Sequence, residues 1–232
     1  MSQSWKEVWA KRKLDPSRDT VLAQLLAADG LDTGFGSVRE ESWRDFVVRT
    51  ASALELGPEE EIFDLGCGAG AFLYPLYEKG HQIGGLDQSD ALIRYAREAM
   101  PEGSFVCGDA VDLDSEERWD VVVSCGVFLY FLDLRYAQRV IEQMVKKARK
   151  CVAILDVPDL STKEAAMAYR RGTLGETEYE ERYRGLDHLF YERKWIMRQF
   201  KALGCRNVYT IDQKIEGYPN AQFRFNAFAK VG

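Results

Sequence analysis

Short apolar runs alternate with amphipathic segments along most of the chain. Five stretches have the apolar residues typical of buried strands: EIFDLG, HQIGGLD, GSFVCGDA, WDVVVSC and CVAILDV. Between them, residues 89–100 and 133–150 carry apolar residues at helical spacing and begin at a capping serine or aspartate. Strands that alternate with helices at this spacing predict a parallel sheet with right-handed crossovers. The pattern therefore predicts an α/β fold.

The two ends of the chain depart from this alternation. Residues 1–36 predict a helical extension, and the charged, tyrosine-rich residues 161–190 predict an insertion rather than another strand–helix unit. The last two strand-like segments, CRNVYTID and AQFRFNAFAK, are joined by a short turn and are therefore expected to pair antiparallel. We expect one domain over residues 37–232, with a helical lid built from the extension and the insertion.

Composition narrows the class of protein. Hydrophobic residues make up 46% and charged residues 29% of the 232 residues, which is ordinary for a globular protein. No apolar run reaches the length of a membrane span, and the N-terminal sequence lacks the apolar core of a signal peptide. With a net charge of −6 and only short basic segments, a nucleic-acid partner is not expected. We expect a cytoplasmic protein that does not bind membranes.

The cysteines and histidines do not form a recognisable framework. The five cysteines are odd in number and show no C-x-x-C spacing, and there are only two histidines. We therefore expect reduced thiols, no structural disulfide and no metal site.

Three glycines follow the first predicted strand within five positions. Gly66, Gly68 and Gly70 lie where an open parallel sheet binds ligands, at the carboxyl end of a strand. The stretch GCGAGA also satisfies the loose G-x-G-x-x-G/A pattern of dinucleotide sites. The spacing alone therefore fits either a dinucleotide or S-adenosylmethionine.

Acidic residues at three successive strands favour S-adenosylmethionine. Asp64 lies inside the first strand, where a carboxylate could stay charged beneath a cationic ligand. Asp87 ends the second strand, where an acid can accept hydrogen bonds from both ribose hydroxyls. Asp109 ends the third strand and is placed to accept a hydrogen bond from an adenine amino group. A ligand with an ammonium, a ribose and an adenine matches the three acids.

The segments IFDLGCGAG, GGLDQS, VCGDAVDL and WDVVVSCGVFLYF resemble the successive motifs of class I S-adenosylmethionine-dependent methyltransferases. The resemblance covers about residues 55–160, with the closing antiparallel strands also in place. It implies a Rossmann-like three-layer sandwich, whose seven-stranded, mostly parallel sheet has an antiparallel last strand, and S-adenosylmethionine as the cofactor. The candidates for cofactor binding are Asp64, Gly66, Cys67, Gly68, Asp87, Gln88, Asp109, Ala110 and Cys125.

Two residues are candidates for catalysis. His188 follows the insertion that we expect to cover the substrate, so it could act as a base or contact the substrate, or it could cap a helix or lie on the surface. Tyr130 follows the fourth strand, which faces the methyl-transfer point in the resembled fold, so it could bind substrate or pack. His81 precedes the second strand, away from the expected site.

Aromatic and cationic residues are candidates for contacts with the acceptor. Arg224 separates two phenylalanines of the last strand and points away from them, so solvent and a substrate carboxylate are both open as its partner. The other candidates for acceptor binding are Trp9, Phe35, Phe128, Tyr169 and Tyr191.

Missing motifs narrow the acceptor. The segment after the fourth strand lacks the Pro-Pro-aromatic motif of nucleobase amino methylation and the Pro-Cys of cytosine methylation. The chain resembles small-metabolite enzymes, including those of bacterial natural-product pathways, so the leading hypothesis is methyl transfer to an oxygen or nitrogen of a small molecule. An NAD-dependent oxidoreductase and a non-catalytic cofactor-binding protein are the alternatives, and the oligomeric state is open.

Overall fold

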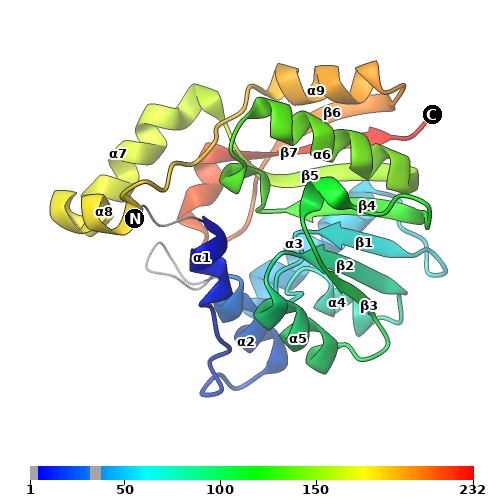
Figure 1. Ribbon diagram of the computed structural model, residues 1–232, viewed down its shortest axis with the longest axis horizontal. Helices are drawn as coiled ribbons and strands as arrows, with labels where there is room; N and C mark the ends of the chain where they lie inside the picture. Colours follow the sequence, from blue (N-terminus) through cyan, green and yellow to red (C-terminus); the bar gives the residue numbers. More distant parts are fainter. Residues whose placement is uncertain (1–4, 32–37) are drawn as a thin grey trace.

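The computed structural model describes residues 5–31 and 38–232, so the candidate Phe35 lies outside the described residues. A seven-stranded sheet in the order β3-β2-β1-β4-β5-β7-β6 runs through the molecule (Figure 1). Its strands are β1 (Ile62–Leu65), β2 (Ile83–Asp87), β3 (Ser104–Cys107), β4 (Trp119–Cys125), β5 (Ala148–Pro158), β6 (Arg206–Asp212) and β7 (Arg224–Lys230).

The strand directions confirm the predicted sheet. β1 pairs parallel with β2 and β4, β2 with β3, and β4 with β5. β7 is the last strand along the chain, and it inserts antiparallel between β5 and β6. Because β1 lies between β2 and β4, the strand order reverses beside it, and this is where open α/β sheets form a ligand crevice.

Helices cover both faces of the sheet. One hydrophobic cluster joins α2, α3, α4 and α5 to one face, and a second joins α6 and α9 to the other. Neighbouring strand residues alternate between the two, as Ile62 does with Phe63. The α-helices are α1 (Trp5–Ala10), α2 (Val21–Ala28), α3 (Glu40–Ala53), α4 (Tyr74–Tyr77), α5 (Asp90–Ala99), α6 (Leu134–Lys147), α7 (Lys163–Leu174), α8 (Glu176–Tyr183) and α9 (Arg193–Ala202).

Two parts of the chain leave the three layers. Helices α7 and α8 form an arm that extends beyond the sheet on the same side of the molecule as α1 (Figure 1). The remaining elements are short 3-10 turns at the carboxyl ends of strands or before β7: η1 (Ala110–Asp112), η2 (Phe128–Tyr130), η3 (Leu160–Thr162) and η4 (Pro219–Phe223). These segments surround the end of the sheet at which the parallel strands terminate.

One element boundary differs from the prediction. The amphipathic pattern predicts a helix to residue 150, but α6 ends at Lys147 and residues 148–150 begin β5. The ammonium of Lys147 donates hydrogen bonds to the carbonyl oxygens of Asp114 (2.8 Å) and Glu117 (2.9 Å). Pairing of Ala148 with Trp119 of β4 then takes the chain into the sheet, so the predicted helix was three residues too long.

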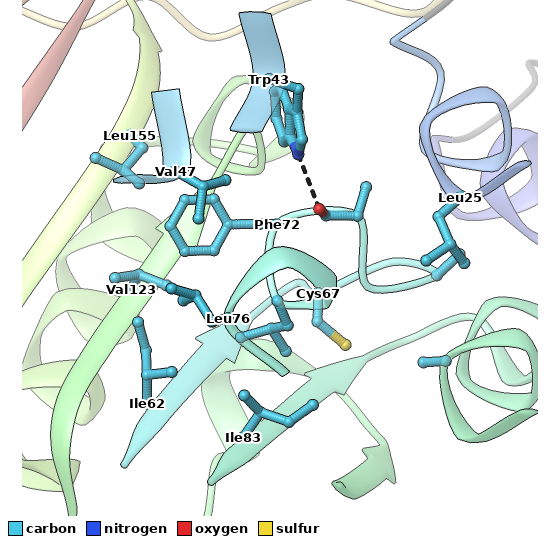
Figure 2. Packing of buried hydrophobic residues seen from close by; sticks show 14 of the residues in the cluster. Leu25, Trp43, Val47, Ile62, Cys67, Phe72, Leu76, Ile83, Val123 and Leu155 are labelled. Atoms are coloured by element: carbon cyan, nitrogen blue, oxygen red, sulfur yellow. Dashed lines mark hydrogen bonds between the residues drawn. The ribbon is translucent and has the colours of Figure 1, made fainter. Parts of the chain in front are cut away.

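The loop after the glycines is fixed from the side by α3. The indole Nε1 of Trp43 donates a hydrogen bond of 2.8 Å to the carbonyl oxygen of Ala71 (Figure 2). Trp43 is buried, and Phe72 of the same loop packs beside Val47 in the cluster that Figure 2 shows. The glycine turn therefore sits on a packed base rather than on a free surface loop.

Candidate active site

A cavity of about 970 Å³ opens at the carboxyl ends of the parallel strands. Its wall combines the glycine loop, the ends of β2, β4 and β5, the start of β7, and residues of α1, α7 and α8. Ligand pockets of small-molecule enzymes typically measure 300–1,000 Å³. The cavity is therefore large enough for a nucleoside cofactor together with a second small molecule.

Gly66 and Gly68 give the loop a shape that other residues would not adopt. Their φ angles are 81° and 56°, in the left-handed region that favours glycine. A Cβ on Gly68 would lie 2.2 Å from Oδ1 of Asp29. The loop therefore brings its backbone against a side chain from the end of α2.

Asp29 binds this loop directly. Its Oδ1 accepts a hydrogen bond from the backbone N–H of Ala69 (2.6 Å), and its Oδ2 accepts one from Ala71 (3.0 Å). Burial, partly opposed by these two hydrogen bonds, raises the pKa of Asp29 to about 7. Asp29 is not among the residues predicted for the site, because it lies 40 residues before its partner Ala69 and nothing in the local sequence marks it.

Asp87 is held in position at the end of β2. Its Oδ2 accepts a hydrogen bond of 3.0 Å from Gly68 N–H, and its Oδ1 accepts one of 2.8 Å from Ser89 N–H. Burial raises its pKa despite these bonds. The predicted Gln88 and Cys67 also line the cavity, one exposed and the other buried.

Asp64 has an unused acceptor atom in this end of the cavity. Its side chain is 2% exposed, and Oδ1 accepts no hydrogen bond from any described residue. Burial, followed by the charges of Asp29 and Asp87, raises its pKa well above the usual value. A buried acceptor atom without a hydrogen-bond donor destabilises the folded protein, so a ligand that donates to Oδ1 is favoured. Because three carboxyl groups lie close together, a cationic ligand is favoured over an anionic one.

The predicted adenine contacts lie farther along the same wall. Asp109 and Ala110 both line the cavity. The hydroxyl of Tyr136 donates a hydrogen bond to Oδ1 of Asp109, which also accepts one from Val111 N–H (3.1 Å). Cys125 lines the cavity too, and burial raises the pKa of its thiol, which therefore stays protonated. Tyr136 also lines the cavity and is not among the residues predicted for the site.

Aromatic rings form the opposite end of the cavity. The ring of Trp5 stacks on that of His188, with centroids 4.8 Å apart and planes 11° apart. Tyr130 lies 4.7 Å from Trp5, 5.3 Å from Trp9 and 5.7 Å from His188, measured between centroids. The structure therefore brings the predicted Trp9, Tyr130 and His188 together, with α1 completing the wall.

Arg170 determines the tautomer of His188. Nη1 of Arg170 lies at hydrogen-bonding distance from Nδ1 of His188. A guanidinium only donates, so Nδ1 is the acceptor and a neutral ring carries its proton on Nε2. Burial and the charges of Arg170 and Arg224 lower the pKa of His188 well below its usual value. His188 therefore presents a donor to the cavity, while burial raises the pKa of Tyr130 to about 12 and keeps its phenol protonated.

Arg224 is buried among polar groups at the start of β7. Its Nη1 donates a hydrogen bond of 3.1 Å to the carbonyl oxygen of Asp156 and lies 3.9 Å from that residue's Oδ2. The hydroxyl of Tyr218 donates to the same Oδ2 at 3.0 Å. Asp156 has a φ of 57° within an irregularity of the β5–β7 pairing, a strained backbone of the kind found at functional sites.

Three predicted acceptor contacts do not line the cavity. Phe128 is 1% exposed and packs on Phe131 and Tyr191, with centroids 4.7 and 5.8 Å apart. Tyr191 is fully buried and donates from its hydroxyl to the carbonyl oxygen of Phe128 (2.8 Å). Tyr169 packs on Phe223, with centroids 5.8 Å apart. The turn η2 directs Tyr130 to the cavity and Phe128 into the core.

Comparisons with known proteins agree with this geometry. A family model described as a methyltransferase domain matches residues 62–151. The matched residues therefore form a methyltransferase domain. Over 178 residues the chain is also 28% identical to a demethylmenaquinone methyltransferase of Thermotoga maritima, a match that covers 75% of this chain. The same match covers 65% of the Thermotoga protein, so this chain spans less than two thirds of that relative's length.

Solved structures confirm the fold of the methyltransferase domain. An S-adenosylmethionine-dependent methyltransferase from Clostridium acetobutylicum is 14% identical, with a TM-score of 0.64 over 89% of this chain and 98% of that one. A magnesium protoporphyrin IX methyltransferase from Synechocystis PCC 6803 with bound SAH is 14% identical, with a TM-score of 0.58 over 97% and 90% of the two chains. At this identity the likeness shows the fold alone.

Within residues 5–31 and 38–232, no helix has the length and apolar character needed to cross a membrane. In the same part of the chain, no three His, Cys, Asp or Glu side chains are grouped so that they could hold a metal ion. All five cysteines are free.

Proposed function

We propose that this protein transfers the methyl group of S-adenosylmethionine to an oxygen or nitrogen atom of a small-molecule acceptor. The observation that carries the proposal is the buried Oδ1 of Asp64, which accepts no hydrogen bond from a described residue and lies beside Asp29 and Asp87. An ammonium on the ligand supplies the missing donor and offsets the clustered negative charge. A dinucleotide pyrophosphate, in contrast, would add negative charge to the same place.

The other residues at the glycine-loop end of the cavity, which we call the cofactor end, have roles that follow from their positions. Asp87, oriented by Gly68 and Ser89, has the carboxylate that would accept hydrogen bonds from the ribose hydroxyls. Gly66 and Gly68 let the methionine part approach the backbone, and Asp109 with Ala110 would contact the adenine. When bound, the cofactor supplies a methyl group already activated by its positively charged sulfur.

The protein's own contribution is to position the acceptor and to exclude water. Tyr130 and the Nε2–H of His188 are donors on the acceptor's side of the cavity and would orient it by hydrogen bonds. We propose that residues 1–36 and 161–190 act as the lid, because Trp5 and Trp9 of α1 and Arg170 of α7 already form part of the cavity wall. The domain proper then comprises residues 37–232.

The proposed setting is a small-molecule pathway in the cytoplasm. The Thermotoga relative is a demethylmenaquinone methyltransferase, and this supports a small metabolite rather than a macromolecule as acceptor here. Free thiols at all five cysteines are in keeping with a reducing compartment. A bacterial natural-product pathway is one setting that would fit, and neither a nucleic acid nor a membrane is needed as a partner.

Calorimetric titration with S-adenosylmethionine, S-adenosylhomocysteine and NAD tests the cofactor. Micromolar binding of the first two, and none of NAD, is the expected result. Binding of NAD alone would support the oxidoreductase instead. Cofactor binding without methyl transfer to any amine, phenol or carboxylate in a screen would support the non-catalytic alternative.

A further inference from the structure

Two buried arginines lie at the acceptor's end of the cavity. Arg170 comes from α7 and Arg224 from the start of β7, and each is only 4% exposed. Both line the cavity. Arginine is almost never fully buried unless it is paired, because an uncompensated buried charge strongly destabilises the folded protein. Two such residues in one wall therefore require an explanation.

Counting the charges shows that one of the two is not compensated. Arg224 lies near the carboxylate of Asp156 and donates to the backbone of the same residue. Arg170 forms no ion pair with a carboxylate of the described residues, and its hydrogen-bond partner is the neutral ring of His188. Burial and the charge of Arg224 lower the pKa of Arg170. Among the described residues, Asp156 is the one carboxylate within 4.0 Å of either guanidinium, so the pair of arginines has one positive charge without an ion-pair partner.

Asn220 supplies a second observation at the same place. It lies in η4, just before Arg224, lines the cavity, and is 8% exposed. Its Oδ1 is buried and accepts no hydrogen bond from any described residue. A buried side chain of this kind in a cavity wall indicates that a polar ligand completes its hydrogen bonding.

We propose that Arg170 and Arg224 bind a carboxylate group of the acceptor. The inference rests on the proposed function, because it defines the class of molecule that the methyltransferase accepts. One carboxylate matches the single excess charge, and its two oxygens can each accept from a guanidinium. A phosphate dianion would leave the site with a net negative charge. Asn220 would then contact a hydroxyl or amine of the same molecule.

His188 reports on this site. The charged residues that act on its ring are Arg170 from α7 and Arg224 from β7, while Trp5 of α1, Tyr130 of η2 and Tyr183 of α8 contact it as uncharged rings. A bound carboxylate offsets the two cations and therefore raises the pKa of His188. The only other histidine in the sequence is His81, whose Nδ1 lies 3.3 Å from the carbonyl oxygen of Glu60 and which does not line the cavity. It is an internal reference in the same spectrum.

The experiment is an NMR titration of the two histidine rings without cofactor. The ligands are benzoate, 4-hydroxybenzoate and phenylacetate, each with its neutral amide, and phenyl phosphate. At least one carboxylate is expected to shift the His188 signals and raise its pKa while His81 stays unchanged, and the amides are expected to have no effect. The proposal is overturned if the amides bind as well as the acids, if no carboxylate moves His188, or if phenyl phosphate binds more tightly than benzoate.

Variants of Arg170 test whether this arginine binds the carboxylate. Arg170→Gln is expected to weaken carboxylate binding at least tenfold, and Arg170→Lys, which keeps the charge, by less. Arg171→Gln is the matched control, because Arg171 is the next residue of α7 but points to Glu176, 3.6 Å away, and not to the cavity. It should leave binding unchanged, and equal losses in both Gln variants would contradict the proposal.

Calorimetry of the same samples with S-adenosylmethionine separates the two proposals. If the cofactor binds but no carboxylate does, the carboxylate site is wrong and the methyltransferase proposal stands. If a carboxylate binds and the cofactor does not, the carboxylate site stands and the methyltransferase proposal is wrong.

Discussion

The two ends of the cavity differ in charge and in origin. The cofactor end carries the carboxylates of Asp29, Asp64 and Asp87, whereas the acceptor end carries the guanidiniums of Arg170 and Arg224. Apart from Asp29, the first set lies in one stretch of the chain that includes β1 and β2. The second set is brought together from α7 and β7, over 50 residues apart, with α1 added from the other end of the sequence.

This difference shows how a single cavity can hold two unlike molecules. A cationic cofactor is favoured where acids cluster, and an anionic acceptor is favoured where arginines do. Each end disfavours the other's ligand, because like charges in a partly dehydrated site repel strongly. On the proposed function, charge would orient the pair of ligands before any specific contact is made.

The largest expected effect is a loss of folding stability as pH rises. It tests whether the clustered acids at the cofactor end of the cavity destabilise the folded protein when they ionise. The pKa of Asp29 is about 7 in the folded protein, against an ordinary value of 3.8. The folded protein thus holds a proton that the unfolded chain has lost, so stability from this group is fully present below pH 3.8 and is lost as pH rises through about 7. The loss has an upper bound of about 4 kcal/mol, since one pH unit corresponds to 1.36 kcal/mol.

Urea unfolding of the wild type and of Asp29→Asn, at several pH values between 4 and 8, measures this loss. The variant should show a shallower fall in the free energy of unfolding over that range. The pKa values of Asp64 and Asp87 are raised as well, mainly by burial, which acts in both proteins. The variant also loses the effect of the Asp29 charge on the pKa of Asp64, and this loss makes the fall shallower in the same direction. Parallel curves for the two proteins would mean that Asp29 titrates normally and does not strain the loop.

A smaller effect is expected from removing one carboxylate contact to the cofactor. Asp87→Ala should weaken S-adenosylmethionine binding by about 1.5–3 kcal/mol, the contribution of hydrogen bonds to a charged group. Asp90→Ala is the matched control, because Asp90 is exposed on α5 and pairs with Arg94 instead. Calorimetry is expected to show a loss for the first variant only. If carboxylate binding fell to the same extent, the two ends of the cavity would not be independent.

The same contrast explains how far the sequence could predict the molecule. The parallel direction of β1 to β5 follows from the alternation of apolar runs with amphipathic segments, because such a pattern leaves few ways to bury both faces of a sheet. The family resemblance predicts the number of strands and the antiparallel last strand, and the full strand order comes from the structure. The glycine loop and the acids at the strand ends are local features, so Asp64, Asp87 and Asp109 could be placed from the sequence. The three-residue error at the end of α6 arose because strand pairing outcompeted a helical pattern.

The acceptor end could not be predicted in the same way. Arg170 lies in a charged helix where one arginine in a run looks like its exposed neighbour Arg171, and only the packing of α7 separates them. Asp29 and Asp156 act through backbone contacts to distant segments, and such contacts leave no local pattern. Phe128 and Tyr130 are two residues apart, yet only the latter reaches the cavity, because a 3-10 turn separates their directions.

The smallest expected effect concerns His188, and its size decides which role this residue has. His188→Ala should lower turnover about tenfold, or about 1.4 kcal/mol, because the variant loses a hydrogen-bond donor and the stack on Trp5. The rate is measured with whichever carboxylate-bearing acceptor supports methyl transfer, and His81→Ala is the matched control that should leave it unchanged. Cofactor affinity should stay within twofold, since His188 lies at the other end of the cavity. A loss of a thousandfold or more would instead indicate a general base, and it would require the ring to release Arg170 during the reaction.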